Sequence, residues 1–410
     1  MPIIEGRLAD IDGVRHGQIA IDNGVISAVG PDLGKATHVF GDDCLIFAGM
    51  GDIHIHARED VTQEETHKET FACASAAALH GGVLHVADMP NNLAAPIDEA
   101  SYAAKETLLQ GQRLPVVFTL YAGIGPGTKP LVRNVPYKAY MGPSVGHLFF
   151  SSLEELDRTL ANYVGQAVSF HCEDPVLLEK HKGAPTHEER RPAECELSAT
   201  RFALAMIEKY RLRGKLCHYS VGEGLALIRA AKANGLSVTA EVTPHHVYYD
   251  TAQITPANRQ AMQMNPPLRA PADRVAMLEA LRDGTADYLA TDHAPHTLAE
   301  KARGVSGQPH LDTYGPFVTW LLVEQGFTPE RVAAICSANP GTFVNPYQPE
   351  KWGRLLPGYI GSLTVLNLRK PTTIRREDLK TKCGWSPFEG VTFPGSVAAV
   401  FVGGERTGTA

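Results

Sequence analysis

The sequence lacks a disulfide framework and shows no export or membrane segment. Its seven cysteines are an odd number, are widely spaced and include no Cys-x-x-Cys pair. Disulfides persist in oxidising compartments, so this pattern predicts a reducing cytoplasm. The N-terminus has no basic stretch followed by an apolar one, and no window approaches about 18 uninterrupted apolar residues. We therefore expect neither a signal peptide nor a membrane span.

The sequence also has no excess of positive charge. Its 38 Lys and Arg stand against 45 Asp and Glu, which gives a net charge of −7. A nucleic-acid-binding domain needs a basic face, so we expect no nucleic-acid partner. The 44% of apolar residues is ordinary for a globular protein with a large core. We find no internal repeat and no low-complexity segment.

The two ends of the chain share a β-rich pattern. Near the N-terminus, two apolar runs flank Asp22-Asn23-Gly24, which is a strong hairpin signal. Near the C-terminus, Ser362–Leu368 alternates and Val397–Val402 ends at a glycine pair. Because chain ends often lie close together, we expect residues 1–48 and 346–410 to form one small domain, a β-sandwich.

The middle of the chain, residues 49–345, alternates short apolar runs with helical patterns. Ser152-Leu153-Glu154-Glu155 is a capping-box pattern, and a second helix is predicted from about Gly224 to Ala233. Strands that alternate with helices indicate parallel βαβ units, and eight of them indicate an α/β fold of the (β/α)8 TIM-barrel type. The candidate strands are Met50–His54, Val83–Asp88, Val116–Tyr121, Tyr137–Tyr140, Ala167–His171, Lys215–Tyr219, Ser237–Val242 and Tyr288–Thr291.

Candidate metal ligands lie at the ends of these strands, which form one face of a barrel. In an extended segment His54 and His56 point to the same side, and two imidazoles suit Zn²⁺ or a similar metal. His171 and His218 each follow an apolar strand. Each of these histidines alone fits a structural role, but four on one face favour a metal site. Asp292 also ends an apolar strand, where a carboxylate is costly unless it is paired or binds metal.

Lys138 lies in the fourth candidate strand. A protonated lysine cannot bind a cation. If CO₂ adds to the amine, the resulting carbamate offers two oxygens and can bridge two metals. Taken alone, an exposed or ion-paired lysine is the alternative, and the sequence leaves both open.

These residues lie in motifs that resemble the amidohydrolase superfamily and, within it, the dihydroorotases. The resemblance covers nearly the whole chain. Three departures affect only substrate loops: Arg58-Glu59-Asp60-Val61 after the His-x-His pair, Asn92 where threonine is usual, and Gly307–Asp312 in place of a glycine-rich stretch. The motifs that carry the resemblance are Gly49–Arg58, Asp88–Asn92, Tyr137–Gly142, Thr239–His246, Asn265–Arg269, Ala290–His296 and Cys383–Gly390.

The resemblance implies a role for each residue. Arg58, Asn91 and His296 would hold a substrate α-carboxylate, and Asn265 would contact a pyrimidine ring. Asp292 would act as general base and then general acid. The implied ligands of two divalent metal ions, expected to be zinc, are His54, His56 and Asp292 for one ion, His171 and His218 for the other, and carboxylated Lys138 as the bridge.

The implied reaction is the reversible cyclisation of N-carbamoyl-L-aspartate to L-dihydroorotate in pyrimidine biosynthesis, with water activated by the two metals. Arg58 would pair bidentately with the substrate carboxylate. The alternative for Arg58 is a surface arginine, or one paired with Glu59 or Asp60.

Two other functions stay open: a dihydropyrimidinase, hydantoinase or allantoinase, and a non-catalytic relative that serves as a partner subunit. Arg58 and Asn91 argue against the first, and the complete ligand set argues against the second. We also expect a homodimer.

Overall fold

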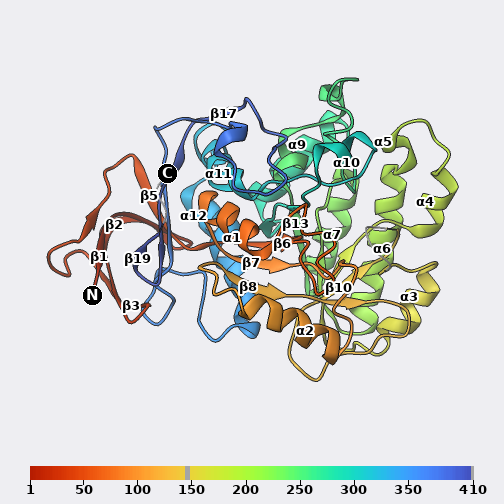
Figure 1. Ribbon diagram of the computed structural model, residues 1–410, viewed down its shortest axis with the longest axis horizontal. Coiled ribbons are helices and arrows are strands. Elements are labelled where there is room, and N and C mark those ends of the chain that lie inside the picture. Colours follow the sequence, from red (N-terminus) through yellow and green to blue (C-terminus); the bar gives the residue numbers. More distant parts are fainter. Residues whose placement is uncertain (144–147, 408–410) are drawn as a thin grey trace.

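The chain folds into a strand-rich part and a barrel that lie side by side (Figure 1). The computed structural model describes residues 1–143 and 148–407. Both chain ends lie in the strand-rich part, so the prediction that they meet in one sheet domain is confirmed. The predicted domain boundaries fall between β5 and β6 and within the short helix η5 (Asn345–Tyr347), and the last three residues lie outside the described range.

The strand-rich part is one eight-stranded sheet in the order β19-β18-β15-β5-β1-β2-β3, with β4 beside β1. The predicted hairpin joins β2 to β3, where Asn23 and Gly24 take left-handed φ angles of 49° and 80° that suit a two-residue turn. The sheet encloses a small core of its own, with Ile4, Ile46 and Phe401 fully buried. The strands are β1 (Ile3–Asp10), β2 (Gly13–Asp22), β3 (Val25–Gly30), β4 (His38–Val39), β5 (Cys44–Ala48), β15 (Leu363–Asn367), β18 (Ser396–Val402) and β19 (Glu405–Arg406).

The barrel consists of parallel strands in two hydrogen-bonded groups, β6-β7-β8 and β9 to β14. β8 and β9 are separated only by Tyr121 and together act as the third barrel strand. A parallel bridge between Ile55 and His293 closes the barrel between its first and last strands. The strands are β6 (Met50–Ile55), β7 (Val83–Asp88), β8 (Val117–Leu120), β9 (Ala122–Ile124), β10 (Tyr137–Tyr140), β11 (Ala167–His171), β12 (Arg213–Leu216), β13 (Val238–Val242) and β14 (Tyr288–Leu289).

The eight predicted barrel strands all overlap an observed strand, but two of them end two or three residues earlier than predicted. β12 ends at Leu216, and β14 ends at Leu289. The backbone leaves the strand conformation at His218 and Asp292, whose φ angles are 36° and 48°. An apolar run that continues past the last paired residue hides such a strand end in the sequence.

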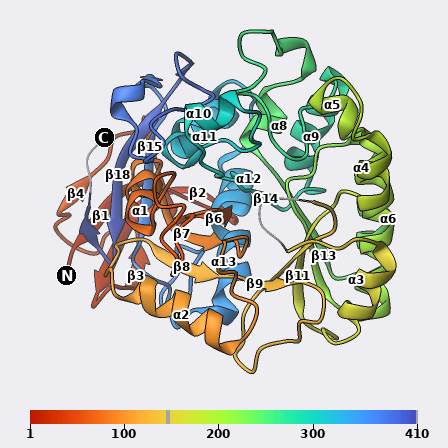
Figure 2. The same ribbon diagram turned by 45° about the vertical axis from the view of Figure 1, so that its right-hand side comes forward.

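The helices cover the outside of the barrel (Figure 2). Both predicted helices are present: Ser152 caps α3 by accepting from the Glu155 N–H, and α7 ends before Asn234-Gly235. The longer helices are α1 (Phe71–His80), α2 (Glu99–Gln110), α3 (Leu153–Leu160), α6 (Ala193–Lys209), α7 (Leu225–Ala233), α9 (Pro271–Asp283) and α11 (Tyr314–Val323). The shorter ones are α4 (Pro175–His181), α5 (His187–Arg190), α8 (Pro244–Tyr248), α10 (Leu298–Ala302), α12 (Pro329–Ala333) and α13 (Asn339–Val344). Among the described residues, no helix has the length and apolar character that crossing a membrane requires.

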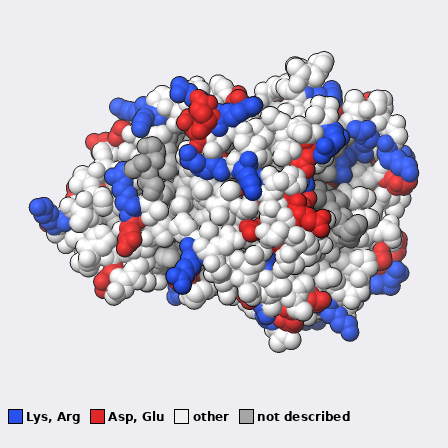
Figure 3. Space-filling view, in the orientation of Figure 1, with Lys and Arg blue, Asp and Glu red and all other residues white. Residues whose placement is uncertain are grey.

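The surface carries both signs of charge. On the face shown in Figure 3, lysines and arginines are scattered among acidic and uncharged residues.

Candidate metal and substrate site

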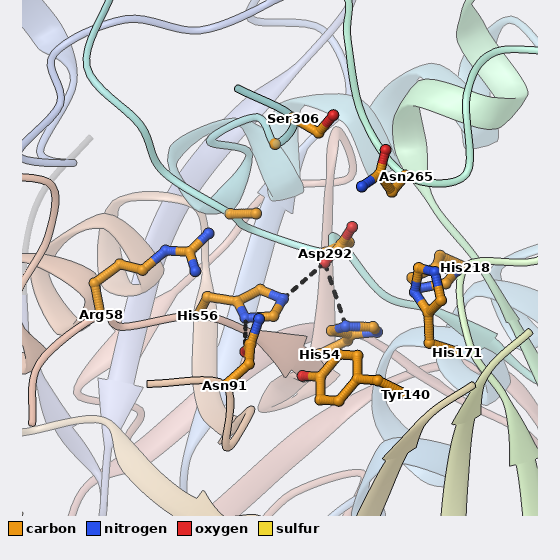
Figure 4. Close-up of a pocket in the computed structure, with 12 residues that line it drawn as sticks. His54, His56, Arg58, Asn91, Tyr140, His171, His218, Asn265, Asp292 and Ser306 are labelled. Carbon is orange, nitrogen blue, oxygen red and sulfur yellow. Dashed lines mark hydrogen bonds and ion pairs between the residues drawn. The ribbon is translucent and has the colours of Figure 1, made fainter. Parts of the chain in front are cut away.

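A cavity opens at the carboxyl ends of the barrel strands, which is where the sequence places the site (Figure 4). Eight of the ten predicted site residues line it, whereas Lys138 and His296 lie behind its surface. The lining residues are His54, His56, Arg58, Asn91, Tyr140, His171, His218, Asn265, Asp292, Ala294, Ser306 and Gly307.

The first predicted ligand group converges. Nε2 of His54 lies 3.2 Å from Oδ1 of Asp292, and Nε2 of His56 lies 3.0 Å from the same oxygen. Figure 4 shows both rings directed at that carboxylate. The Nδ1–H of His56 donates to Oδ1 of Asn91 over 2.7 Å, which leaves Nε2 free to offer its lone pair inward. Together the three side chains form a possible metal-ligand set.

The second predicted pair also converges. Nδ1 of His171 lies 2.8 Å from Nε2 of His218, while Nε2 of His171 donates to Glu173 over 2.7 Å. Burial would raise the pKa of Glu173, but the charge of Arg191 and the His171 hydrogen bond lower it to about 2. Glu173 is therefore an anion that fixes the ring of His171 with Nδ1 facing the cavity.

All four histidines are held neutral. Burial lowers the pKa of His171 and lowers those of His54, His56 and His218 well below the ordinary value. A neutral imidazole keeps the lone pair that metal binding requires. Buried Nδ1 of His218 has no hydrogen-bond partner among the described residues.

Lys138 is fully buried in the midst of these rings. Its Nζ donates to Sγ of Cys217 over 2.9 Å and lies 5.1 Å from the centre of the Tyr140 ring. It forms no ion pair within residues 1–143 and 148–407, so the exposed or ion-paired alternative is wrong. An unpaired buried ammonium is costly, whereas a carbamate here would face neutral imidazoles as an anionic ligand.

The donor set fits two divalent metal ions. Two inward-facing groups of neutral imidazoles, one with a carboxylate, are the ligand types that zinc prefers. Burial raises the pKa of Asp292 to about 7 in the protein alone, and a bound cation favours its charged form.

Glu241 is a buried acid to which the sequence argument gave no role. Its carboxylate contacts Nδ1 of His54 and pairs with Lys215, and Oε1 accepts from the His218 N–H over 3.0 Å. Through these contacts it orients one histidine of each pair. His54, Cys217 and Glu241 also form a second set of close ligand atoms. The signal that could have found Glu241 is an acidic residue within an apolar strand.

Arg58 enters the cavity from the side opposite His171 and His218 (Figure 4). It is only 2% exposed, and its Nε and Nη1 have no hydrogen-bond partner among the described residues. Glu59 and Asp60 bond elsewhere, so the alternative of a surface or locally paired arginine is wrong. The predicted extended segment ends before Arg58, whose φ is 61°, and this turn aims the side chain inward.

The other predicted substrate residues divide into two groups. Asn91 and Asn265 line the cavity, and Oδ1 of Asn265 is buried without a partner among the described residues. His296 does not line it; its Nε2 accepts from Nη2 of Arg58 over 3.2 Å and so supports that side chain. Ser306 and Gly307 line the cavity as well. The sequence places Gly307 in a substrate loop but gives no role to Ser306, which lies in the same loop, where no periodic pattern marks it.

Comparisons with known proteins show the family and the fold of the chain. The amidohydrolase family model matches residues 150–407. The chain is 32% identical over 374 residues to a dihydroorotase of Pyrococcus abyssi, covering 88% of this chain and 83% of that protein. It is 28% identical to a dihydroorotase of Pyrococcus furiosus, covering 98% and 91%. Among solved structures, L-hydantoinase (dihydropyrimidinase) from Arthrobacter aurescens is similar in fold, with a TM-score of 0.89, 24% identity, and 99% and 96% coverage.

Proposed function

Since the chain belongs to the amidohydrolase family, we propose that it is a dihydroorotase, which interconverts N-carbamoyl-L-aspartate and L-dihydroorotate. The observation that carries this proposal is the buried guanidinium of Arg58 at the cavity, whose Nε and Nη1 have no hydrogen-bond partner among the described residues. A buried guanidinium requires an anionic partner, and no described carboxylate supplies one. The α-carboxylate of dihydroorotate would fill this position, whereas a plain dihydropyrimidine has no such group.

Two divalent metal ions, proposed to be zinc, are part of the proposal, and carboxylated Lys138 would be a ligand to both. His54, His56 and Asp292 would hold one ion, and His171 and His218 would hold the other. When bound, such ions lower the pKa of a water molecule and polarise an amide carbonyl.

The side chains of this chain then have distinct tasks. In the ring-opening direction Asp292 accepts a proton from the attacking water and delivers it to the leaving ring nitrogen. Arg58, supported by His296, binds the carboxylate. Oδ1 of Asn91 accepts a hydrogen bond from His56, so the side-chain N–H groups of Asn91 are left to donate to the substrate. The side-chain carbonyl oxygen of Asn265, which has no partner among the described residues, can accept from a ring N–H.

A substrate panel tests the proposal. We would measure kcat/KM of the zinc-loaded protein on dihydroorotate, dihydrouracil, hydantoin and allantoin. We expect dihydroorotate to be preferred by at least about 10²-fold, because the other rings leave Arg58 unpaired. A preference for hydantoin, dihydrouracil or allantoin would contradict the proposal. No turnover of any ring by the metal-loaded protein would point to a non-catalytic relative.

A further inference from the structure

Lys301 is a buried lysine behind the cavity wall. It lies in α10, directly after the loop that carries Asp292 and His296, and is 1% exposed. Its Nζ donates to three backbone carbonyls, those of Gln263 at 2.6 Å and of Val305 and Gly307 at 2.8 Å each. An ammonium has three N–H groups, so this set uses all of them.

The three carbonyls belong to two separate loops that both reach the cavity. One loop leads from Gln263 to Asn265, and the other carries Ser306 and Gly307. Side-chain and backbone bonds join the same loops: the Gly307 N–H donates to the Gln263 carbonyl over 3.0 Å, and Nε2 of Gln263 donates to Oγ of Ser306 over 3.2 Å. Lys301 therefore sits at the junction of the two loops.

Burying the Lys301 cation at this junction costs free energy. Lys301 forms no ion pair with any residue that the structure describes, and burial alone lowers its pKa to about 7. An apolar side chain of similar length would avoid the cost of burying a charge. The indole of Trp385 covers the ammonium, with Nζ 5.9 Å from the ring centre, and its Nε1–H donates to the His296 carbonyl over 2.7 Å. Trp385, from the C-terminal segment, thus covers the junction of the two loops.

We propose that Lys301 is a positioning residue, whose ammonium holds the loops of Asn265 and Gly307 where they contact the substrate ring. It acts through those loops and touches no reacting atom. This assignment rests on the proposed function only in so far as the cavity binds a cyclic amide, whichever ring is preferred.

The first test needs no substrate. Hydrogen–deuterium exchange compares the wild type with Lys301→Met, a variant of similar length without the cation. We expect exchange in segments 261–265 and 304–307 to accelerate at least about tenfold, with the strands that carry the metal ligands unchanged. Unchanged exchange in both segments overturns the proposal, whatever the substrate turns out to be.

The second test separates positioning from general stability. With the ring that the wild type turns over best, Lys301→Met should raise KM at least about tenfold, with kcat within about threefold and metal content unchanged. Gln263→Leu, which breaks the side-chain link between the loops, should raise KM by a smaller factor, and it replaces Lys301→Met as the test if that variant fails to fold.

The matched control is Lys232→Met. Lys232 also donates to two backbone carbonyls, those of Gly284 and Thr285, and pairs with Asp287 at 2.7 Å, but it does not line the cavity. A KM that rises equally in the control, or a loss confined to kcat and metal content, overturns the proposal.

Discussion

The floor and the wall of the cavity are supported differently. The floor, made of the metal-ligand candidates, sits in barrel strands or within a few residues of their carboxyl ends. The wall, made of Arg58, Asn91, Asn265, Ser306 and Gly307, sits on loops that side chains such as Lys301 tie together. Strand ends of a closed barrel are rigid, whereas loops accept substitution more readily. On the proposed function, the metal-dependent chemistry would lie on the rigid strand ends, and substrate recognition would lie on the loops.

Metal removal should have the largest effect, since it disables the floor. We expect about two divalent ions per chain, and a loss of at least about 10³-fold in kcat after chelation, because Lewis-acid stabilisation contributes several kcal/mol. Elemental analysis and an activity assay before and after zinc is restored check this. Full activity in metal-free protein would contradict the role given to the floor.

Asp292→Asn tests proton transfer within the floor. The amide can still offer an oxygen to a metal but cannot accept a proton, so kcat should fall about 10²- to 10⁴-fold with most of the metal retained. The control is Asp287→Asn, at the opposite end of β14, where the carboxylate pairs with Lys232 at 2.7 Å. If Asp292→Asn keeps near-normal turnover, the base lies elsewhere.

Lys138→Met tests the bridge. We expect metal content to fall by about half or more, because a shared ligand of both ions is lost while the histidines remain. Native mass spectrometry of the wild type under CO₂ should show the mass of one added CO₂, absent in the variant. No added CO₂ mass in the wild type, together with unchanged metal content in the variant, would contradict the proposal that carboxylated Lys138 binds both metals.

Gly307→Ala should have the smallest effect and be confined to the wall. The φ of Gly307 is 132°, and a Cβ there would lie 2.6 Å from the Ala294 carbonyl oxygen, so the loop must shift at a cost of about 1–3 kcal/mol. We expect a several-fold rise in KM with kcat and metal content kept. Gly235→Ala is the control: its φ is 79° and its Cβ would meet open space. An equal rise in KM in both variants would show that strain anywhere in the fold acts on the cavity.

The sequence predicts the floor better than the wall for a physical reason. Apolar runs locate barrel strands, and the carboxyl end of such a strand marks where His171 and Asp292 converge. The wall depends on backbone geometry that no periodicity records. Arg58 reaches the cavity through a left-handed turn rather than an extended strand, and Gly307 is brought to it by the carbonyl bonds of Lys301. Glu241 escaped notice because its partners, His54 and Lys215, are distant in sequence.

The central claim is that Arg58 reads a substrate carboxylate above a floor that performs the chemistry. Its most direct test is kcat/KM for dihydroorotate and for dihydrouracil, measured in the wild type and in Arg58→Met. We predict that the variant loses about 10²-fold on dihydroorotate, because a charge-assisted pair is broken and the carboxylate is left unpaired. Its weak activity on dihydrouracil, which has no carboxylate, should change little. Equal losses on both substrates would contradict the claim, since Arg58 would then support the fold or the metals rather than recognition.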